Sequence, residues 1–120
     1  MTHGVHTTLQ VTINEGQIQE FKKLVEEMGK AVEENEPGAK GYQFYLNDDE
    51  TQCVLNESYV NLEAVLAHLK GVAAQTILPK ILSICTMNRF EVFGDVNDEL
   101  MNALAQMGGV NYHFLSGFSR

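Results

Sequence analysis

The chain has 120 residues, enough for one domain, and its 44% hydrophobic and 20% charged residues are typical of a folded globular protein rather than a disordered one. Sixteen acidic residues outnumber eight basic ones, and the basic residues form no stripe that could neutralise a row of phosphates, which argues against a nucleic-acid partner. No apolar run approaches the roughly 18 residues of a membrane span, and the N-terminus does not resemble a signal peptide. These features predict a cytoplasmic protein with no membrane partner.

The first half of the chain predicts a strand, a helix and a hairpin. Residues 5–13 alternate between apolar and polar side chains, as expected for a half-buried strand. Apolar residues then recur at helical spacing up to about Asn35, and the Pro37-Gly38 pair ends that helix. Two more alternating runs, joined by an acidic turn, predict a hairpin that begins near Gly41 and ends near Val60.

The second half begins with Asn61, which is expected to cap a helix that runs to about Ala74. The rest predicts a short helical piece with an internal proline, a strand, a third helix and an extended aromatic tail, at residues 76–84, 86–93, 96–107 and 110–120.

The resulting order β-α-β-β-α-β indicates an α+β fold, the ferredoxin-like sandwich, in which an antiparallel sheet carries its helices on one face. We expect this domain to span residues 1–94. The C-terminal helix and tail, residues 95–120, should pack on the same domain or on a dimer partner. Aromatic residues occur on both faces of the strands, as in Phe44-Tyr45, so the open face should be apolar and pack against a second copy of the chain.

Four short motifs carry a resemblance to a known family: Glu36-Pro-Gly38, Tyr42-x-Phe-Tyr45, Glu57-x-Tyr59 and Ala67-His-Leu69. With these motifs the chain resembles the antibiotic biosynthesis monooxygenases, also called quinol monooxygenase-like proteins, of the dimeric α/β-barrel superfamily. The resemblance covers roughly residues 5–93. It implies a homodimer with a ligand pocket between the sheet and the helices of each subunit. Characterised relatives oxygenate polycyclic phenols or quinols without metal, flavin or haem, whereas others degrade haem or isomerise a small signalling compound.

The candidate pocket wall follows from strand alternation together with this resemblance. Glu57 and Tyr59 share one face of their strand because the side-chain period is two. If the hairpin loop has an even length, Tyr42 and Phe44 lie across the ladder on the same face. In the family, an aromatic residue at the position of Tyr59 tends to point into the pocket. Tyr42, Phe44, Glu57 and Tyr59 are therefore expected to line it.

Three of these side chains are candidate catalytic residues. His68 lies at the boundary of the buried stripe of its helix and is either a general base toward a phenol or a partner of a backbone carbonyl. Tyr59 either orients the substrate hydroxyl or is a core aromatic. An inward-facing Glu57 needs a partner or a raised pKa, so it serves catalysis, an ion pair or a dimer contact.

Arg89 is a further candidate for substrate binding, together with Tyr42 and Phe44. It is placed either to stabilise an anionic intermediate or to pair with Glu57. No pair of histidines has the spacing of a metal site, and Cys53 and Cys85 are isolated in apolar patterns, so we expect no metal and two reduced core thiols. The chain lacks tryptophan, unlike the best-studied polycyclic oxygenases.

The leading functional hypothesis is a cofactor-independent monooxygenase of a small electron-rich aromatic, of the quinol or phenol type. The alternative from another class is a non-catalytic dimeric module that binds a small ligand, with Tyr42, Phe44 and Tyr59 closing the cavity. A third hypothesis is an isomerase or lyase that uses His68 and Glu57 as an acid/base pair. Turnover without oxygen would distinguish this third hypothesis from the first.

Overall fold

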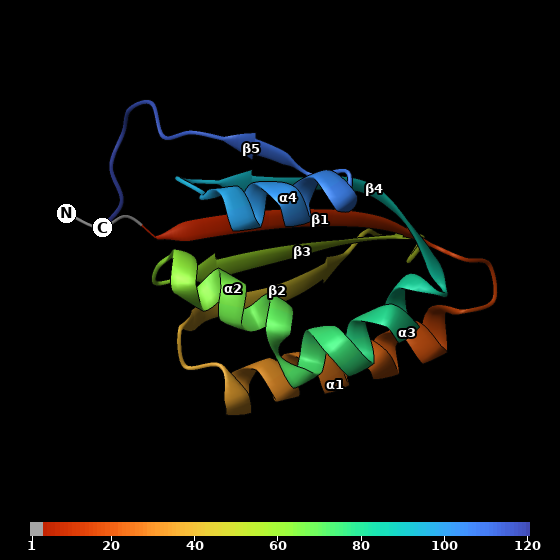
Figure 1. Cartoon of the computed structure of the whole chain (residues 1–120). Helices are drawn as coiled ribbons and strands as arrows, with labels where there is room; N and C mark the ends of the chain where they lie inside the picture. Colours follow the sequence, from red (N-terminus) through yellow and green to blue (C-terminus); the bar gives the residue numbers. More distant parts are fainter. Residues whose placement is uncertain (1–3) are drawn as a thin grey trace.

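The computed structural model describes residues 4–120. They form a five-stranded sheet in the order β2-β3-β1-β4-β5, with the helices on one side of it (Figure 1). All neighbouring strands are antiparallel except β4 and β5, which run parallel. The predicted α+β, ferredoxin-like class is confirmed. In chain order the elements are β1 (Val5–Ile13), α1 (Ile18–Asn35), β2 (Ala39–Leu46), β3 (Gln52–Tyr59), α2 (Leu62–Lys70), the π-helical turn η1 (Ala73–Ile77), α3 (Leu78–Leu82), β4 (Cys85–Phe93), α4 (Asp98–Gln106) and β5 (Val110–Tyr112).

The helical region after Asn61 differs from the prediction of a helix up to Ala74. Helix α2 ends earlier, at Lys70, because Gly71 takes an extended conformation while its N–H donates to the carbonyl oxygen of His68 at 3.1 Å. The chain then continues through η1 into α3, where Pro79 occupies the first turn. Proline is tolerated there because the first N–H groups of a helix have no partner within it.

The register of the β2-β3 hairpin agrees with the prediction from alternation. Tyr42 lies opposite Glu57, and Phe44 lies opposite Leu55. Along β3 the side chains at every second position are buried, with Glu57 and Tyr59 among them. The hairpin therefore turns these side chains toward the helices.

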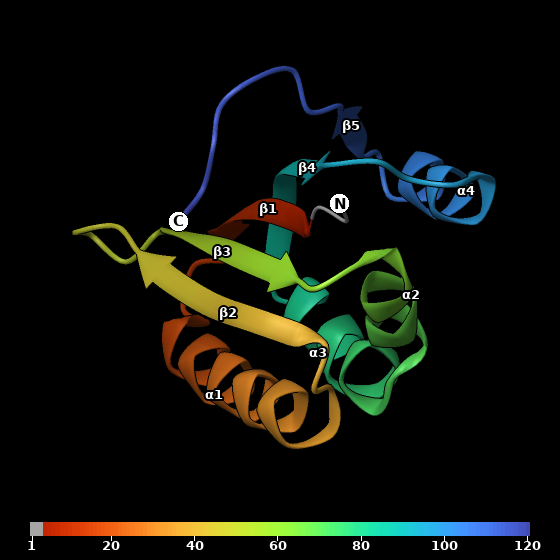
Figure 2. The ribbon, with the colours of Figure 1, turned by 90° about the vertical axis from the view of Figure 1, so that its left-hand side faces the viewer.

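The open face of the sheet is more polar than predicted. Tyr45 on β2 and Phe93 on β4 do lie on this face and are exposed. Between them the strands carry mainly polar side chains, and His6 and Ser58, for example, hydrogen-bond across strands at 3.1 Å. The expectation of an apolar open face therefore holds only at its two margins. The C-terminal tail leaves β5 on this side of the sheet, away from the helices (Figure 2).

Two apolar clusters fill the space between sheet and helices. The first packs α1 and α3 against the strands and contains Phe21, Met28 and the two cysteines. The second packs α2 and α4 around Val65 and Leu104. Cys53 and Cys85 are free thiols, and burial raises the pKa of the Cys53 thiol to about 11. No helix among residues 4–120 is long and apolar enough to cross a membrane.

The turn between α1 and β2 lies tightly against α2. A Cβ atom on Gly38 would come within 2.6 Å of the Cβ atom of Ala64, so only glycine fits there. The N–H of Val60 donates to the carbonyl oxygen of Gly38 at 2.9 Å, which ties this turn to the segment that leads into α2. The end of α1 is thereby brought against the helix that carries His68.

A Gly38→Ala substitution should lower the free energy of unfolding by about 1–3 kcal/mol, because the added methyl group overpacks the contact with Ala64. The matched control is Gly29→Ala on α1, where a Cβ atom meets nothing within 4 Å. This control should stabilise the protein by roughly 0.5–1 kcal/mol, since glycine is a poor helix former. Urea denaturation followed by circular dichroism measures both changes. Equal stability of the two variants would contradict the tight turn.

Candidate active site

The N-terminal cap of α2 sets which of its side chains are buried, and His68 is one of them. The side chain of Asn61 accepts a hydrogen bond from the N–H of Ala64 at 2.9 Å and caps the helix, as predicted. Val65 and His68 then follow on the buried side of α2. His68 is 5% exposed, which is deeper than the boundary position expected from the helical spacing.

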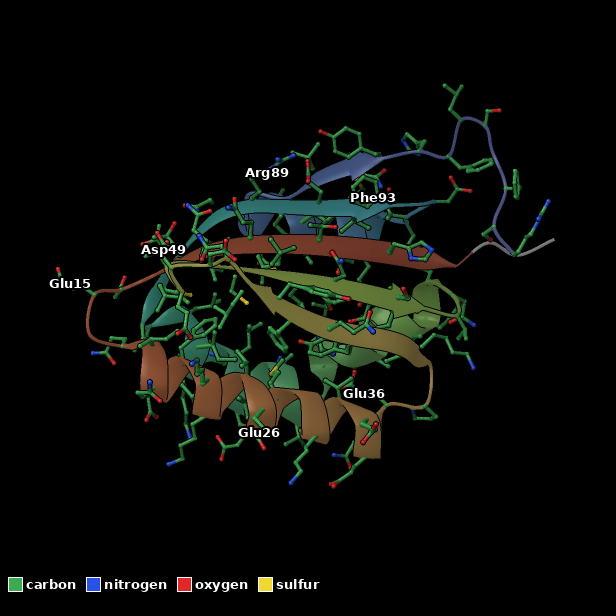
Figure 3. The ribbon with its side chains drawn as sticks, turned by 180° about the vertical axis from the view of Figure 1, so that it is seen from behind. Glu15, Glu26, Glu36, Asp49, Arg89 and Phe93 are labelled. Atoms are coloured by element: carbon green, nitrogen blue, oxygen red, sulfur yellow. The ribbon has the colours of Figure 1, made fainter. Side chains whose placement is uncertain are left out.

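The partner of the His68 ring on one side is a carboxylate. Nδ1 lies 2.6 Å from Oε1 of Glu36, the residue that caps the C-terminus of α1. Figure 3 shows Glu36 at this helix end, beside the start of β2. An ionised carboxylate can only accept, so a proton on Nδ1 suits this contact, and in the neutral form of the ring Nε2 then carries the lone pair. The alternative in which His68 hydrogen-bonds a backbone carbonyl is not what the structure has.

The other ring nitrogen faces Glu57. His68 Nε2 lies 3.6 Å from Oε1 of Glu57, within ion-pair range but too far for a hydrogen bond. The same carboxylate oxygen accepts a hydrogen bond from the Tyr59 hydroxyl. Burial, and then the charge of Glu57, raise the pKa of Tyr59 above its ordinary value, so its hydroxyl stays protonated and donates. We call Glu36, His68, Glu57 and Tyr59 the acid–base chain.

A cavity of about 40 Å³ adjoins this chain. Its lining residues come from the inner face of the sheet and from helices that include α2 and α4. These two helices lie on the same side of the sheet (Figure 2). Five polar residues reach its wall: Thr7, Tyr42, Glu57, Tyr59 and His68. The remaining wall is apolar, and α4 with its following residue contributes Leu100, Ala103, Leu104 and Met107. The cavity therefore has one polar end in an otherwise apolar enclosure.

Tyr42 and Phe44 were both predicted to line the pocket, and the structure separates them. Tyr42 is on the cavity wall, with its ring centroid 5.4 Å from that of His68. Phe44 packs edge-on against Tyr42, at a centroid distance of 5.5 Å, and lines a second small cavity with Phe21 and Met28. The prediction for Phe44 is wrong because it faces the α1 side of the core.

Arg89 does not reach the cavity either. Its Nη2 atom lies 2.8 Å from Oε2 of Glu91, and its side chain is largely exposed. Figure 3 shows Arg89 on β4, far from Glu36. Strand alternation explains this position, because Phe90 faces the cavity and its neighbour must then face outward. The predicted pairing of Arg89 with Glu57 is wrong.

Sequence reasoning missed two residues of the site. Glu36 entered the sequence analysis only within the Glu36-Pro-Gly38 motif, with no role at the site. Thr7 stands on the buried face of β1 between Val5 and Leu9, and a polar residue in that position was a detectable signal.

The chemistry available at this site is proton transfer. One imidazole has a carboxylate partner on Nδ1, and its Nε2 atom lies 3.6 Å from Glu57 beside a largely apolar cavity. Among residues 4–120, no group of three or more His, Cys, Asp or Glu side chains has the arrangement of a metal site.

Residues 4–79 match the sequence profile of the antibiotic biosynthesis monooxygenase family. Among solved structures, MupZ from Pseudomonas fluorescens is similar with a TM-score of 0.86 and 25% identity, over 99% of this chain and 96% of MupZ. Rv0793 from Mycobacterium tuberculosis is similar with a TM-score of 0.68 and 16% identity, over 80% of this chain and 98% of that one.

A candidate antibiotic biosynthesis monooxygenase from Caulobacter crescentus is similar with a TM-score of 0.67 and 16% identity, over 76% of this chain and 86% of that one. A comparison with functionally curated proteins gives no match. The family profile covers more than half of the sequence and includes α1 with its C-cap, β3 and α2, the elements that carry the acid–base chain. The chain belongs to the antibiotic biosynthesis monooxygenase family.

Proposed function

We propose that this protein is a cofactor-independent monooxygenase that acts on a small electron-rich aromatic of the phenol or quinol type. The observation that carries the proposal is the buried His68, whose Nδ1 is held by Glu36 while Nε2 remains available beside the cavity. This arrangement suits a general base, because the carboxylate fixes the tautomer and stabilises the imidazolium that forms. Membership of the family supports the use of oxygen.

In the proposed reaction, His68 Nε2 takes the proton of the substrate hydroxyl. Glu36 and Glu57 stabilise the positive charge that develops on the ring, at 2.6 and 3.6 Å respectively. The substrate anion adds dioxygen at an electron-rich ring carbon. Cleavage of the O–O bond, with loss of the hydrogen on that carbon, leaves a quinone. One oxygen atom of dioxygen enters the product and the other leaves as water.

The surroundings of the acid–base chain favour His68 as the base, because the two tyrosines beside it stay protonated and can act as hydrogen-bond donors. Burial raises the pKa of Tyr42, as it does that of Tyr59, and the charge of Glu57 adds to both shifts. Both hydroxyls therefore keep their protons. The apolar remainder of the wall limits access of water to the ionised substrate. Water would otherwise hydrate this anion and make it less reactive toward oxygen.

A His68→Asn variant should lose about 10²–10⁴-fold in kcat/KM, the usual contribution of a general base. The measurement is oxygen uptake with a panel of single-ring quinols, naphthols and anthrones. The matched control is His113→Asn, which makes the same change at an exposed histidine in the tail. Its activity should equal that of the unmodified protein.

Two results of this assay would contradict the proposal. One is no turnover of any member of the panel above buffer, and the other is full turnover by a His68→Ala/Tyr59→Phe double variant. A parallel assay under nitrogen distinguishes the isomerase or lyase hypothesis from the monooxygenase proposal. Product formation at an unchanged rate without oxygen would assign His68 and Glu57 to acid/base chemistry of that kind.

A Glu36→Gln variant should lower kcat by about 10–100-fold with little change in KM, because a neutral amide replaces a charge-assisted hydrogen bond to the imidazole. Glu34→Gln is the control, since Glu34 is exposed on the same helix. Steady-state kinetics on any active substrate measures both variants. A fall in kcat of the same size in both would mean that Glu36 has no specific role.

The size of the cavity favours one rival function, a non-catalytic module that binds a small ligand. A volume of about 40 Å³ holds only a few water molecules, whereas ligand pockets usually reach several hundred Å³. An aromatic substrate therefore requires residues of the wall to move apart. Saturable binding of a phenol with no consumption of oxygen and no product would favour this rival.

We also propose a homodimer, joined through the open face of the sheet. The exposed aromatic residues Tyr45, Phe93 and Tyr112 lie at the margins of this face, and Phe93 stacks on Tyr112. Light scattering at micromolar concentration should give a mass of twice 13.4 kDa. A Tyr45→Lys/Phe93→Lys variant should shift the protein toward the monomer. A monomeric unmodified protein would contradict the proposal.

A further inference from the structure

Thr7 carries a buried hydroxyl group that the acid–base chain does not use. The side chain is 4% exposed, and its Oγ1 atom has no hydrogen-bond partner among the described residues. The buried neighbours on the same face of β1 are apolar, so valine would fill this position with the same shape and without the hydroxyl. A buried hydroxyl without a partner destabilises a fold. A ligand that hydrogen-bonds to Thr7 would explain why this position carries a hydroxyl.

The position of Thr7 places this hydroxyl at the polar end of the cavity. Thr7 lies directly opposite Glu57 in the β1-β3 ladder, and both line the cavity with His68. Residues opposite each other in such a ladder have neighbouring side chains. On the other side, β4 presents Val92 opposite Thr7, which offers no hydrogen-bonding group in its side chain.

The hydrogen-bonding capacity that remains in the cavity is specific. The Tyr59 hydroxyl donates to Glu57, and His68 Nδ1 donates to Glu36. Four groups at this end of the cavity remain: His68 Nε2, the second oxygen of Glu57, and the hydroxyls of Tyr42 and Thr7. Among these four, Thr7 Oγ1 is the fully buried atom without a hydrogen-bond partner in the described residues. A carbonyl group of a ligand would accept from Thr7 but would leave Nε2 without a donor. A hydroxyl group satisfies both, because it donates to Nε2 and accepts from Thr7.

We propose that Thr7 Oγ1 and His68 Nε2 together bind one hydroxyl group of an otherwise apolar ligand. When His68 removes the proton, the Thr7 hydroxyl remains as a donor to the resulting oxyanion. The cavity then selects compounds with a single hydroxyl at one end and an apolar body. The reaction of such a ligand with oxygen rests on the function proposed above, but its selective binding does not.

The test is a binding measurement under nitrogen, so that it does not depend on turnover. The probes are 4-fluorophenol and 4-fluorotoluene, which differ only by a hydroxyl in place of a methyl group, and ¹⁹F NMR titration gives their dissociation constants. The unmodified protein should bind the phenol more tightly. Thr7→Val should reduce this preference by about three- to tenfold, the size of one neutral hydrogen bond.

Two further variants keep the test specific. Thr7→Ser retains the hydroxyl and should retain most of the preference. Thr8→Val makes the same substitution one residue along β1, on the open face of the sheet, and should leave the preference unchanged. The melting temperature of ligand-free Thr7→Val should equal or exceed that of the unmodified protein, because the unpaired hydroxyl is gone.

Three outcomes would overturn the inference: an unchanged preference in Thr7→Val, no preference for the phenol in the unmodified protein, or no binding of either probe. Selective phenol binding that depends on Thr7, combined with no oxygen uptake, would leave this inference standing and remove the proposed monooxygenase reaction. The two proposals can therefore fail separately.

Discussion

A buried imidazole between two carboxylates dominates the interior of this protein. His68, Glu36 and Glu57 are all at most 10% exposed in their side chains, and moving charged groups out of water is unfavourable unless they are paired. The hydrogen bond to Nδ1 and the Tyr59 hydroxyl on Glu57 provide that pairing. The apolar clusters on either side offer no hydrogen-bonding partners for these groups. Their pairing therefore constrains how α1, α2 and β3 pack.

Two turns and one helix cap place these side chains in the fold. The Gly38 turn carries Glu36 to α2, the Asn61 cap sets the start of α2, and the hairpin register turns Glu57 inward. Each of these features is local in sequence, yet together they assemble a chain from three elements. Such a site depends on its geometry, so substitutions of its positioning residues should perturb it as well as substitutions of its chemical residues.

Periodicity predicted which side chains of β3 face the interior. A period of two along β3 turned Glu57 and Tyr59 to the inside, and helical spacing brought His68 close to them. Periodicity could not assign Arg89, because only the observed pairing of β4 with β1 shows that Phe90 faces the cavity. Phe44 shares the face of Tyr42 but lies two pairs farther along the ladder, over α1. Glu36 was missed because its contact spans 32 residues and depends on a turn whose path alternation does not describe.

In the proposed function, Glu36 holds the proton of His68 on Nδ1 and leaves Nε2 as the base. Long-range ¹H–¹⁵N NMR of the labelled imidazole, in mildly alkaline buffer, reports the protonation of each ring nitrogen directly. We expect a protonated Nδ1 and an unprotonated Nε2 for His68, with the Nδ1 signal altered in Glu36→Gln. A proton on Nε2, or a His68 spectrum that matches an exposed histidine and ignores Glu36→Gln, would contradict it.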